Sequence, residues 1–186
     1  MMDTLILVSG LPGAGKTTVA KKLAYRLGDQ AIHFDIDDIK RGVVVDSVAL
    51  ENDIDPDEIR WVYYQEALNL THRTFEEGVY NCVIMDEVFH SKELRTRISD
   101  WCICQGVQSQ WVVVQCSYEV IERRLNSNPR DGHILTAEQC LKLNRRFEEL
   151  FDEFTIEESV TVINSDGKHV SNFDMSKIRQ SKVPPL

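Results

Sequence analysis

The sequence predicts an α/β fold in which helices cover both faces of a parallel β-sheet. Short, wholly apolar runs alternate with amphipathic stretches along most of the 186 residues, a pattern typical of buried parallel strands connected by helices. A glycine-rich segment separates the first apolar run from the first amphipathic stretch, and carboxylates end two of the later apolar runs. In such sheets ligands bind beyond the carboxyl ends of the strands, so the chemistry is expected at these positions.

The expected elements follow one another along the chain. Pro56 followed by two acidic residues indicates a helix start, and Thr136 with Gln139 forms a capping-box pattern. A long, mostly helical region is expected before residue 77. The other helices are predicted at residues 16–27, 91–105, 118–126 and 136–151, and the strands at 4–9, 31–35, 81–86, 110–116 and 160–164.

Length and composition limit the classes of protein that fit. The chain can bury one sizeable core, and the absence of a linker-like segment predicts a single domain over residues 1–186. A net charge of −9 and a pI near 5.0 argue against broad attraction to nucleic acid. No apolar stretch approaches the roughly 20 residues of a membrane helix. The five cysteines show no zinc-ligand spacing, and we expect reduced thiols and a cytoplasmic location.

The segment SGLPGAGKTT contains the pattern GxxxxGKT, from Gly10 to Thr17, between a predicted strand and a predicted helix. Glycines allow successive backbone amides to turn around an anion, and the helix that follows points its unpaired amides at the same place. Lys16 would reach the β- and γ-phosphates of a nucleotide, and the Thr17 hydroxyl would bind Mg²⁺. The predicted nucleotide-binding residues are Gly10, Leu11, Pro12, Gly13, Ala14, Gly15, Lys16, Thr17 and Thr18.

Three carboxylates follow the second strand, in HFDIDDIKRG. An aspartate at a helix start often serves as a cap, but three exceed what capping needs. A carboxylate that accepts the proton of a hydroxyl group assists phosphoryl transfer. We predict that Asp37 is this base, with Asp35 as the alternative and Asp38 as a cap. Lys40 and Arg41 are candidates for binding the acceptor, and solvated surface positions are the alternative for both.

Two further segments supply candidates. In CVIMDE the apolar strand ends in Asp86, a predicted member of the magnesium site, with Glu87 as a weaker candidate. Contact with the acceptor, or a purely structural position at the strand end, is the alternative for Asp86. The segment SNPRDGH is rich in turn-forming residues, and we expect a short lid at about residues 127–136. Arg124 precedes this segment and Arg130 lies within it. Both are candidates for contacting the transferred phosphate, because a lid that excludes water favours transfer over hydrolysis. Surface ion pairs are the alternative for both arginines.

Taken together, SGLPGAGKTTVAKKL, HFDIDDIKRG, VIMDEVF and CSYEVIERRLNSNPR resemble the small phosphate-loop kinases of the nucleoside-monophosphate-kinase superfamily. The sequence is most similar to the branch that contains polynucleotide 5′-hydroxyl kinase domains and chloramphenicol phosphotransferase. The resemblance extends from Leu5 to about Asn164, and its loop motif is specific for nucleotides.

This resemblance implies a three-layer α/β/α fold of the phosphate-loop NTPase type, with a five-stranded parallel sheet of order 2-3-1-4-5. It implies Mg²⁺–ATP as the phosphoryl donor, Asp37 as the base and Lys40 near the acceptor. It makes Arg124 and Arg130 the lid arginines, with Arg124 also contacting the nucleotide. The turn at residues 164–167 corresponds to the loop on the adenine side.

The sequence favours an ATP-dependent kinase that acts on a hydroxyl group of a small molecule. Polynucleotide kinases of this branch have an arginine where Lys40 stands, and lysine lacks the planar fork that grips a phosphate. With the negative net charge, this makes a nucleic-acid acceptor a weaker alternative. A nucleotide-dependent switch or regulatory ATPase is a further alternative, although neither NKxD nor DxxG is present. The acceptor and the oligomeric state remain open at this stage.

Overall fold

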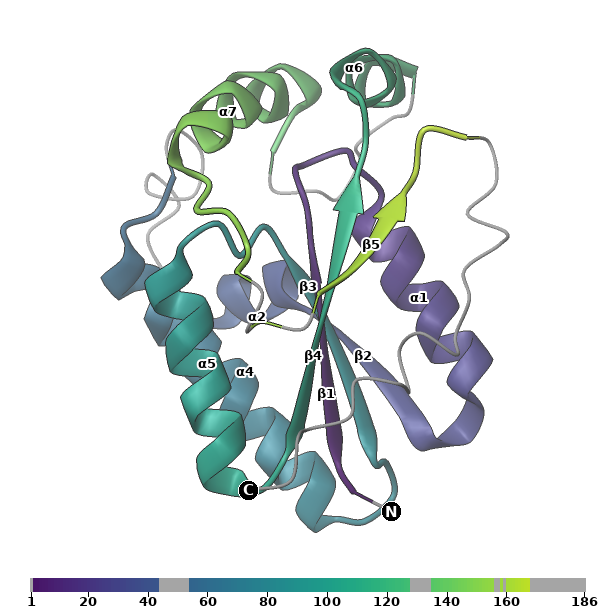
Figure 1. Ribbon diagram of the computed structural model, residues 1–186, viewed down its shortest axis with the longest axis vertical. Coiled ribbons are helices and arrows are strands. Elements are labelled where there is room, and N and C mark those ends of the chain that lie inside the picture. Colours follow the sequence, from purple (N-terminus) through teal and green to yellow (C-terminus); the bar gives the residue numbers. More distant parts are fainter. Residues whose placement is uncertain (1, 44–53, 128–134, 156–157, 159, 168–186) are drawn as a thin grey trace.

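The computed structural model is a twisted parallel sheet between two layers of helices, with further helices at the carboxyl ends of the strands (Figure 1). The structure describes residues 2–43, 54–127, 135–155, 158 and 160–167. The predicted three-layer α/β fold is therefore confirmed.

All strand pairs in the five-stranded sheet are parallel, and the strands lie in the order β2-β3-β1-β4-β5, as expected. β1 is central and pairs with β3 and β4, so the loop that follows it emerges in the middle of the carboxyl edge. The strands are β1 (Thr4–Ser9), β2 (Ala31–Asp35), β3 (Cys82–Glu87), β4 (Gln108–Gln115) and β5 (Val160–Asn164).

Helices α5 and α7 begin at residues whose side chains cap a backbone amide of the first turn. At α5 the Ser91 hydroxyl accepts a hydrogen bond from the Leu94 amide, and at α7 Thr136 and Gln139 form the predicted capping box. A short 3-10 turn (Gly28–Gln30) joins α1 to β2. The helices are α1 (Lys16–Leu27), α2 (Ile36–Val43), α4 (Asp57–Glu76), α5 (Lys92–Gln105), α6 (Tyr118–Ser127) and α7 (Ala137–Leu150).

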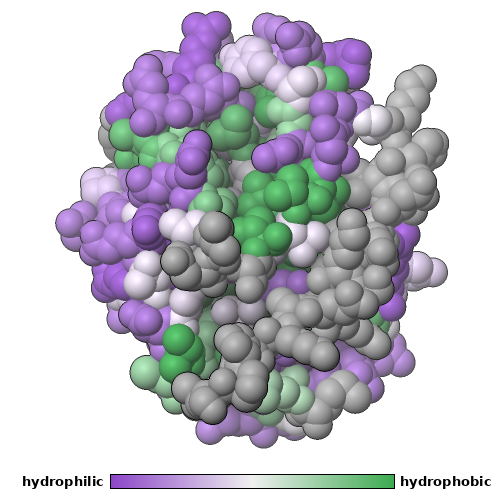
Figure 2. All heavy atoms as spheres, in the orientation of Figure 1, coloured by the Kyte–Doolittle hydropathy of each residue, from purple (hydrophilic) through white to green (hydrophobic). Residues whose placement is uncertain are grey.

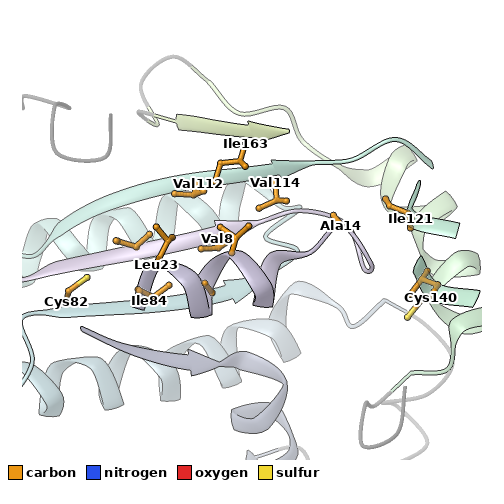
Figure 3. Close-up of a cluster of buried hydrophobic side chains, with 14 residues drawn as sticks. Val8, Ala14, Leu23, Cys82, Ile84, Val112, Val114, Ile121, Cys140 and Ile163 are labelled. Carbon is orange, nitrogen blue, oxygen red and sulfur yellow. The ribbon is translucent and has the colours of Figure 1, made fainter. Parts of the chain in front are cut away.

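Two apolar layers fill the space between the sheet and its helices. Alternate residues of β1 point to opposite faces, so Ile6 and Val8 pack with α1 whereas Leu5 and Leu7 pack with α4 and α5. Figure 3 shows the first layer, in which Leu23 of α1 lies over Val8 and Ile84. Residues of α6 and α7 extend this layer beyond the strand ends, and the second layer contains a cluster of aromatic residues: Tyr63, Tyr64, Phe89 and Trp111.

α6 and α7 lie beyond the carboxyl ends of the strands, at the top of Figure 1, and hydrophilic side chains dominate this end of the molecule in Figure 2. Most of the expected lid, including Arg130, falls outside the described residues. Within the described part of the chain, no helix combines the length and the apolar character needed to cross a bilayer. The single domain and the cytoplasmic location stay predictions.

Candidate active site

The phosphate loop, residues 10–15, connects the central strand to α1. Gly10, Gly13 and Gly15 have φ angles of +154°, +85° and +100°, values that residues with a side chain rarely adopt. The Lys16 Nζ atom donates to the Leu11 carbonyl at 3.3 Å. The lysine therefore folds back over the loop, where an anion held by its backbone amides would also contact the ammonium group.

Side chains from the far end of the chain support this loop. Asn144 of α7 is fully buried, and its Nδ2 donates to the Pro12 carbonyl at 3.0 Å. The Ala14 carbonyl accepts from the Ser165 hydroxyl at 2.7 Å and from the predicted lid residue Arg124 at 3.2 Å. Arg124 also donates to the Ser165 backbone carbonyl. Arg124 thus joins the phosphate loop to the turn after β5, where the resemblance expects the adenine side.

Thr17 and Asp86 lie together as the sequence suggested. The Thr17 hydroxyl, in the first turn of α1, donates to Asp86 Oδ2 of β3 at 2.7 Å, and His33 Nε2 of β2 lies 2.5 Å from Asp86 Oδ1. Mg²⁺ prefers oxygen ligands and usually keeps several waters together with one or two protein groups. The hydroxyl and the carboxylate therefore fit a Mg²⁺ ion whose remaining ligands are water and phosphate. Within the residues described, no group of three or more acidic, histidine or cysteine side chains surrounds a possible metal position.

The predicted base Asp37 lies in the first turn of α2. Burial raises its pKa to about 6, helped by the nearby charges of Glu87 and Asp35, whereas Lys16 and Lys40 act in the opposite direction. Burial also raises the pKa of Asp35, with a further contribution from Asp86. The Asp35 Oδ1 atom accepts a hydrogen bond from the Asp37 amide at 3.0 Å. Asp35 thus performs the local capping task, and the prediction of Asp38 as the cap was wrong, because the exposed Asp38 carboxylate pairs with Arg41 instead. Asp37 has a pKa suited to a general base near neutral pH.

The two predicted acceptor-binding cations both have carboxylate partners. Lys40 Nζ lies 2.5 Å from Asp55 Oδ2, and the two side chains are only 14% and 3% exposed. Asp55 Oδ2 also accepts from the Tyr63 hydroxyl at 3.3 Å. Arg41 pairs with Asp38 at 2.7 Å in a much more exposed position. The structure therefore brings Lys40 into a buried cluster beside Asp37, whereas Arg41 belongs to the outer surface of α2.

A buried ion pair that the sequence analysis missed completes this region. Arg60, in the first turns of α4, donates to Glu87 Oε1 at 2.7 Å and to the Asp55 carbonyl at 3.1 Å. Burial by itself would raise the pKa of Glu87, but Arg60 and Lys16 outweigh that effect and lower it. We call Asp37, Lys40, Asp55, Arg60 and Glu87 the acceptor side.

Comparisons with known proteins identify the family and the fold. A model of the family described as "AAA domain" matches residues 5–150. The chain belongs to this AAA-domain family. A comparison with curated protein sequences found no match.

Several solved structures share the fold of this family member. A sugar kinase from Janibacter sp. HTCC2649 aligns with a TM-score of 0.66 and 19% identity, over 87% of this chain and 85% of that chain. A gluconokinase from Sinorhizobium meliloti 1021 aligns with a TM-score of 0.59 and 14% identity, over 95% of this chain and 87% of that chain. The Mycobacterium tuberculosis APS kinase, in complex with AMPPNP and APS, aligns with a TM-score of 0.54 and 14% identity, over 90% of this chain and 91% of that chain. The AAA-domain protein thus has the fold of the phosphate-loop kinases.

Proposed function

We propose that this protein is an ATP-dependent kinase that transfers the γ-phosphate to a hydroxyl group of a small molecule. The observation that carries the proposal is the position of Asp37, a carboxylate with a pKa of about 6, within electrostatic range of Lys16 on the phosphate loop. A general base next to a phosphate-binding lysine is the arrangement that phosphoryl transfer to an alcohol needs. The kinase neighbours in fold support the same reaction class.

The chain's own groups divide the task. The backbone of residues 10–18 and the Lys16 ammonium bind the phosphates of ATP. Asp37 accepts the proton of the acceptor hydroxyl as its oxygen bonds to the γ-phosphorus and the bond to the departing ADP oxygen breaks. Thr17 and Asp86 would hold Mg²⁺, which when bound neutralises charge on the phosphates.

The remaining predicted residues keep distinct proposed roles. Arg124 fixes the phosphate loop against the turn after β5, because its guanidinium donates to carbonyls of both. Arg130 stays a prediction as the lid arginine. Asp35 and Lys40 border Asp37 and help to position the acceptor. Arg41 has the weakest case for acceptor binding because its ion pair with Asp38 is exposed.

The test is ADP release measured over a library of hydroxyl compounds, with Asp37→Asn as the key variant. A positive acceptor should raise ADP release by the wild type. The variant should lose about 10²–10⁴-fold of that turnover while nucleotide affinity is unchanged. Asp38→Asn removes a neighbouring, exposed carboxylate of the same helix and should keep its activity.

Two outcomes would contradict the proposal. Slow hydrolysis that no acceptor stimulates, with nucleotide-dependent binding of a protein partner, would favour a regulatory ATPase. Stimulation by 5′-hydroxyl oligonucleotides, with steep salt dependence, would favour a polynucleotide kinase.

A further inference from the structure

The acceptor side of this protein contains cations that are already neutralised, and this limits the acceptors that it can bind. In a kinase of the kind proposed above, the acceptor hydroxyl must lie between Asp37 and the phosphate held by Lys16. The cations whose charges act most on Asp37 are Lys16 and Lys40. Lys16 is assigned to the phosphates of ATP, so Lys40 is the cation left to meet an anionic group on the acceptor.

Lys40 is held away from that task by Asp55. Its ammonium lies 2.5 Å from Asp55 Oδ2 and 5.6 Å from the centre of the Tyr63 ring. Asp55 is 5% exposed as a residue and also accepts from the Tyr63 hydroxyl. An acceptor carboxylate or phosphate that took Lys40 as its partner would leave Asp55 buried beside another negative charge. Separating a buried ion pair in this way is unfavourable.

Arg60 is likewise paired with a carboxylate. Its side chain is 5% exposed and donates to Glu87 Oε1, to the Asp55 carbonyl and to the Tyr64 hydroxyl. The guanidinium also lies 5.6 Å from the centre of the Phe147 ring on α7, so packing restricts its movement. Each cation of the acceptor side thus has one carboxylate partner, while Asp37 adds a further negative charge. An additional anion would meet a region with no surplus positive charge among its described residues.

We infer that the acceptor is an uncharged sugar or polyol alcohol, and that the Lys40–Asp55 and Arg60–Glu87 ion pairs exclude sugar acids and sugar phosphates. This inference rests on the proposed kinase function. It adds selectivity against anionic acceptors, whose binding would disrupt the ion pairs, to the favourable contacts made with an uncharged acceptor.

The experiment compares related acceptors of two charge classes, each at several carbon-chain lengths: an aldose and its alditol, which are uncharged, and the aldonate and phosphate ester of the same sugar, which are anionic. ADP release by the wild type should be stimulated by an uncharged member, with kcat/KM at least about tenfold above that of the acid and phosphate of equal length. A sugar acid or phosphate as the best acceptor would overturn the inference.

Asp55→Asn gives a second, independent measurement. The asparagine keeps an oxygen for Tyr63 but removes the charge that neutralises Lys40. With Mg²⁺–AMPPNP bound, calorimetry should detect gluconate binding to this variant and none to the wild type. Asp38→Asn, which removes the carboxylate of the exposed ion pair with Arg41, should also show no gluconate binding. Gluconate binding to the wild type, or equal behaviour of the two variants, would contradict the inference.

The turnover assay and the gluconate-binding measurement together distinguish a failure of this inference from a failure of the proposed function. If no hydroxyl compound stimulates ADP release, the kinase proposal fails, yet the gluconate measurement still decides whether the acceptor side rejects anions. Near-unchanged circular dichroism of the Asp55→Asn and Asp38→Asn variants establishes that both are folded. The selectivity is therefore measurable whatever the outcome of the turnover assay.

Discussion

The phosphate loop and the acceptor side are held in place by different kinds of interaction. The loop's carbonyls accept hydrogen bonds from Lys16, Arg124, Asn144 and Ser165. The acceptor side is held by ionised side chains that neutralise one another, Lys40 with Asp55 and Arg60 with Glu87. A backbone cradle suits any polyphosphate, whereas buried charge pairs determine which further group can enter. Nucleotide binding and acceptor choice are therefore expected to respond to separate substitutions.

The largest expected effect comes from breaking a buried ion pair. Arg60→Met leaves Glu87, 14% exposed, without its cation. We expect the free energy of unfolding to fall by about 3–5 kcal/mol, measured by urea denaturation. The matched control is Arg73→Met, because Arg73 pairs with Glu66 at positions that are 61% and 46% exposed. That change should be below about 1 kcal/mol, and equal losses in the two variants would show that the acceptor side does not depend on this pair.

The next effect tests the shape of the phosphate loop. In Gly10→Ala the new Cβ would lie 2.6 Å from the Val114 carbonyl oxygen at a φ of +154°, whereas in Gly78→Ala, with a φ of +69°, it would meet nothing within 4 Å. In Gly78→Ala the alanine is strained at this φ angle, and the free energy of unfolding should fall by about 1–2 kcal/mol for that reason alone. In Gly10→Ala the free energy of unfolding should fall by about 1–3 kcal/mol more than in Gly78→Ala, because the new methyl group overpacks the site. The Gly10→Ala variant should also bind nucleotide more weakly. Similar thermal denaturation of the two variants would refute the close packing of the loop.

The smallest effect is a pH dependence. Because the pKa of Asp37 is about 6, kcat/KM should be half-maximal near pH 6 and should fall about tenfold for each pH unit below it. The native pKa lies above the ordinary 3.8, so the stabilising contribution of the protonated carboxyl is complete below about pH 4 and is lost as the pH rises through 6. At pH 8, Asp37→Asn should be more stable than the wild type by up to about 3 kcal/mol. A variant less stable than the wild type at that pH would contradict the buried position of the charge.

Much of the nucleotide side could be predicted because its signals are local. The loop motif is continuous, and the meeting of Thr17 with Asp86, 69 residues apart, follows from two parallel strands ending at the same edge. His33 was missed because a single histidine in a strand gives no pattern, although it contacts Asp86. The hydrogen bonds of Arg124 could not be predicted either, since they depend on how α6 packs against the loop.

The acceptor side could be predicted only in part. Asp37 could be predicted from its position after β2. The partner of Lys40 could not, because Asp55 lies 15 residues further along the chain, just before α4. Arg60 looked like an ordinary polar residue of a helix. Its burial depends on tertiary contacts with Glu87 of β3 and Phe147 of α7, which no local pattern encodes. Residue identity therefore indicated the reactive groups, and tertiary packing determined which cations are already paired with carboxylates and which could bind an acceptor.

The most direct test of the central claim is calorimetry of Mg²⁺–AMPPNP binding to the wild type and to Lys16→Met. The account predicts one nucleotide per wild-type chain and an affinity at least about 10²-fold lower in the variant, with the fold of both verified by circular dichroism. A folded wild type that shows no affinity for the nucleotide, or a variant that binds it equally well, would contradict the phosphate loop on which every other assignment depends.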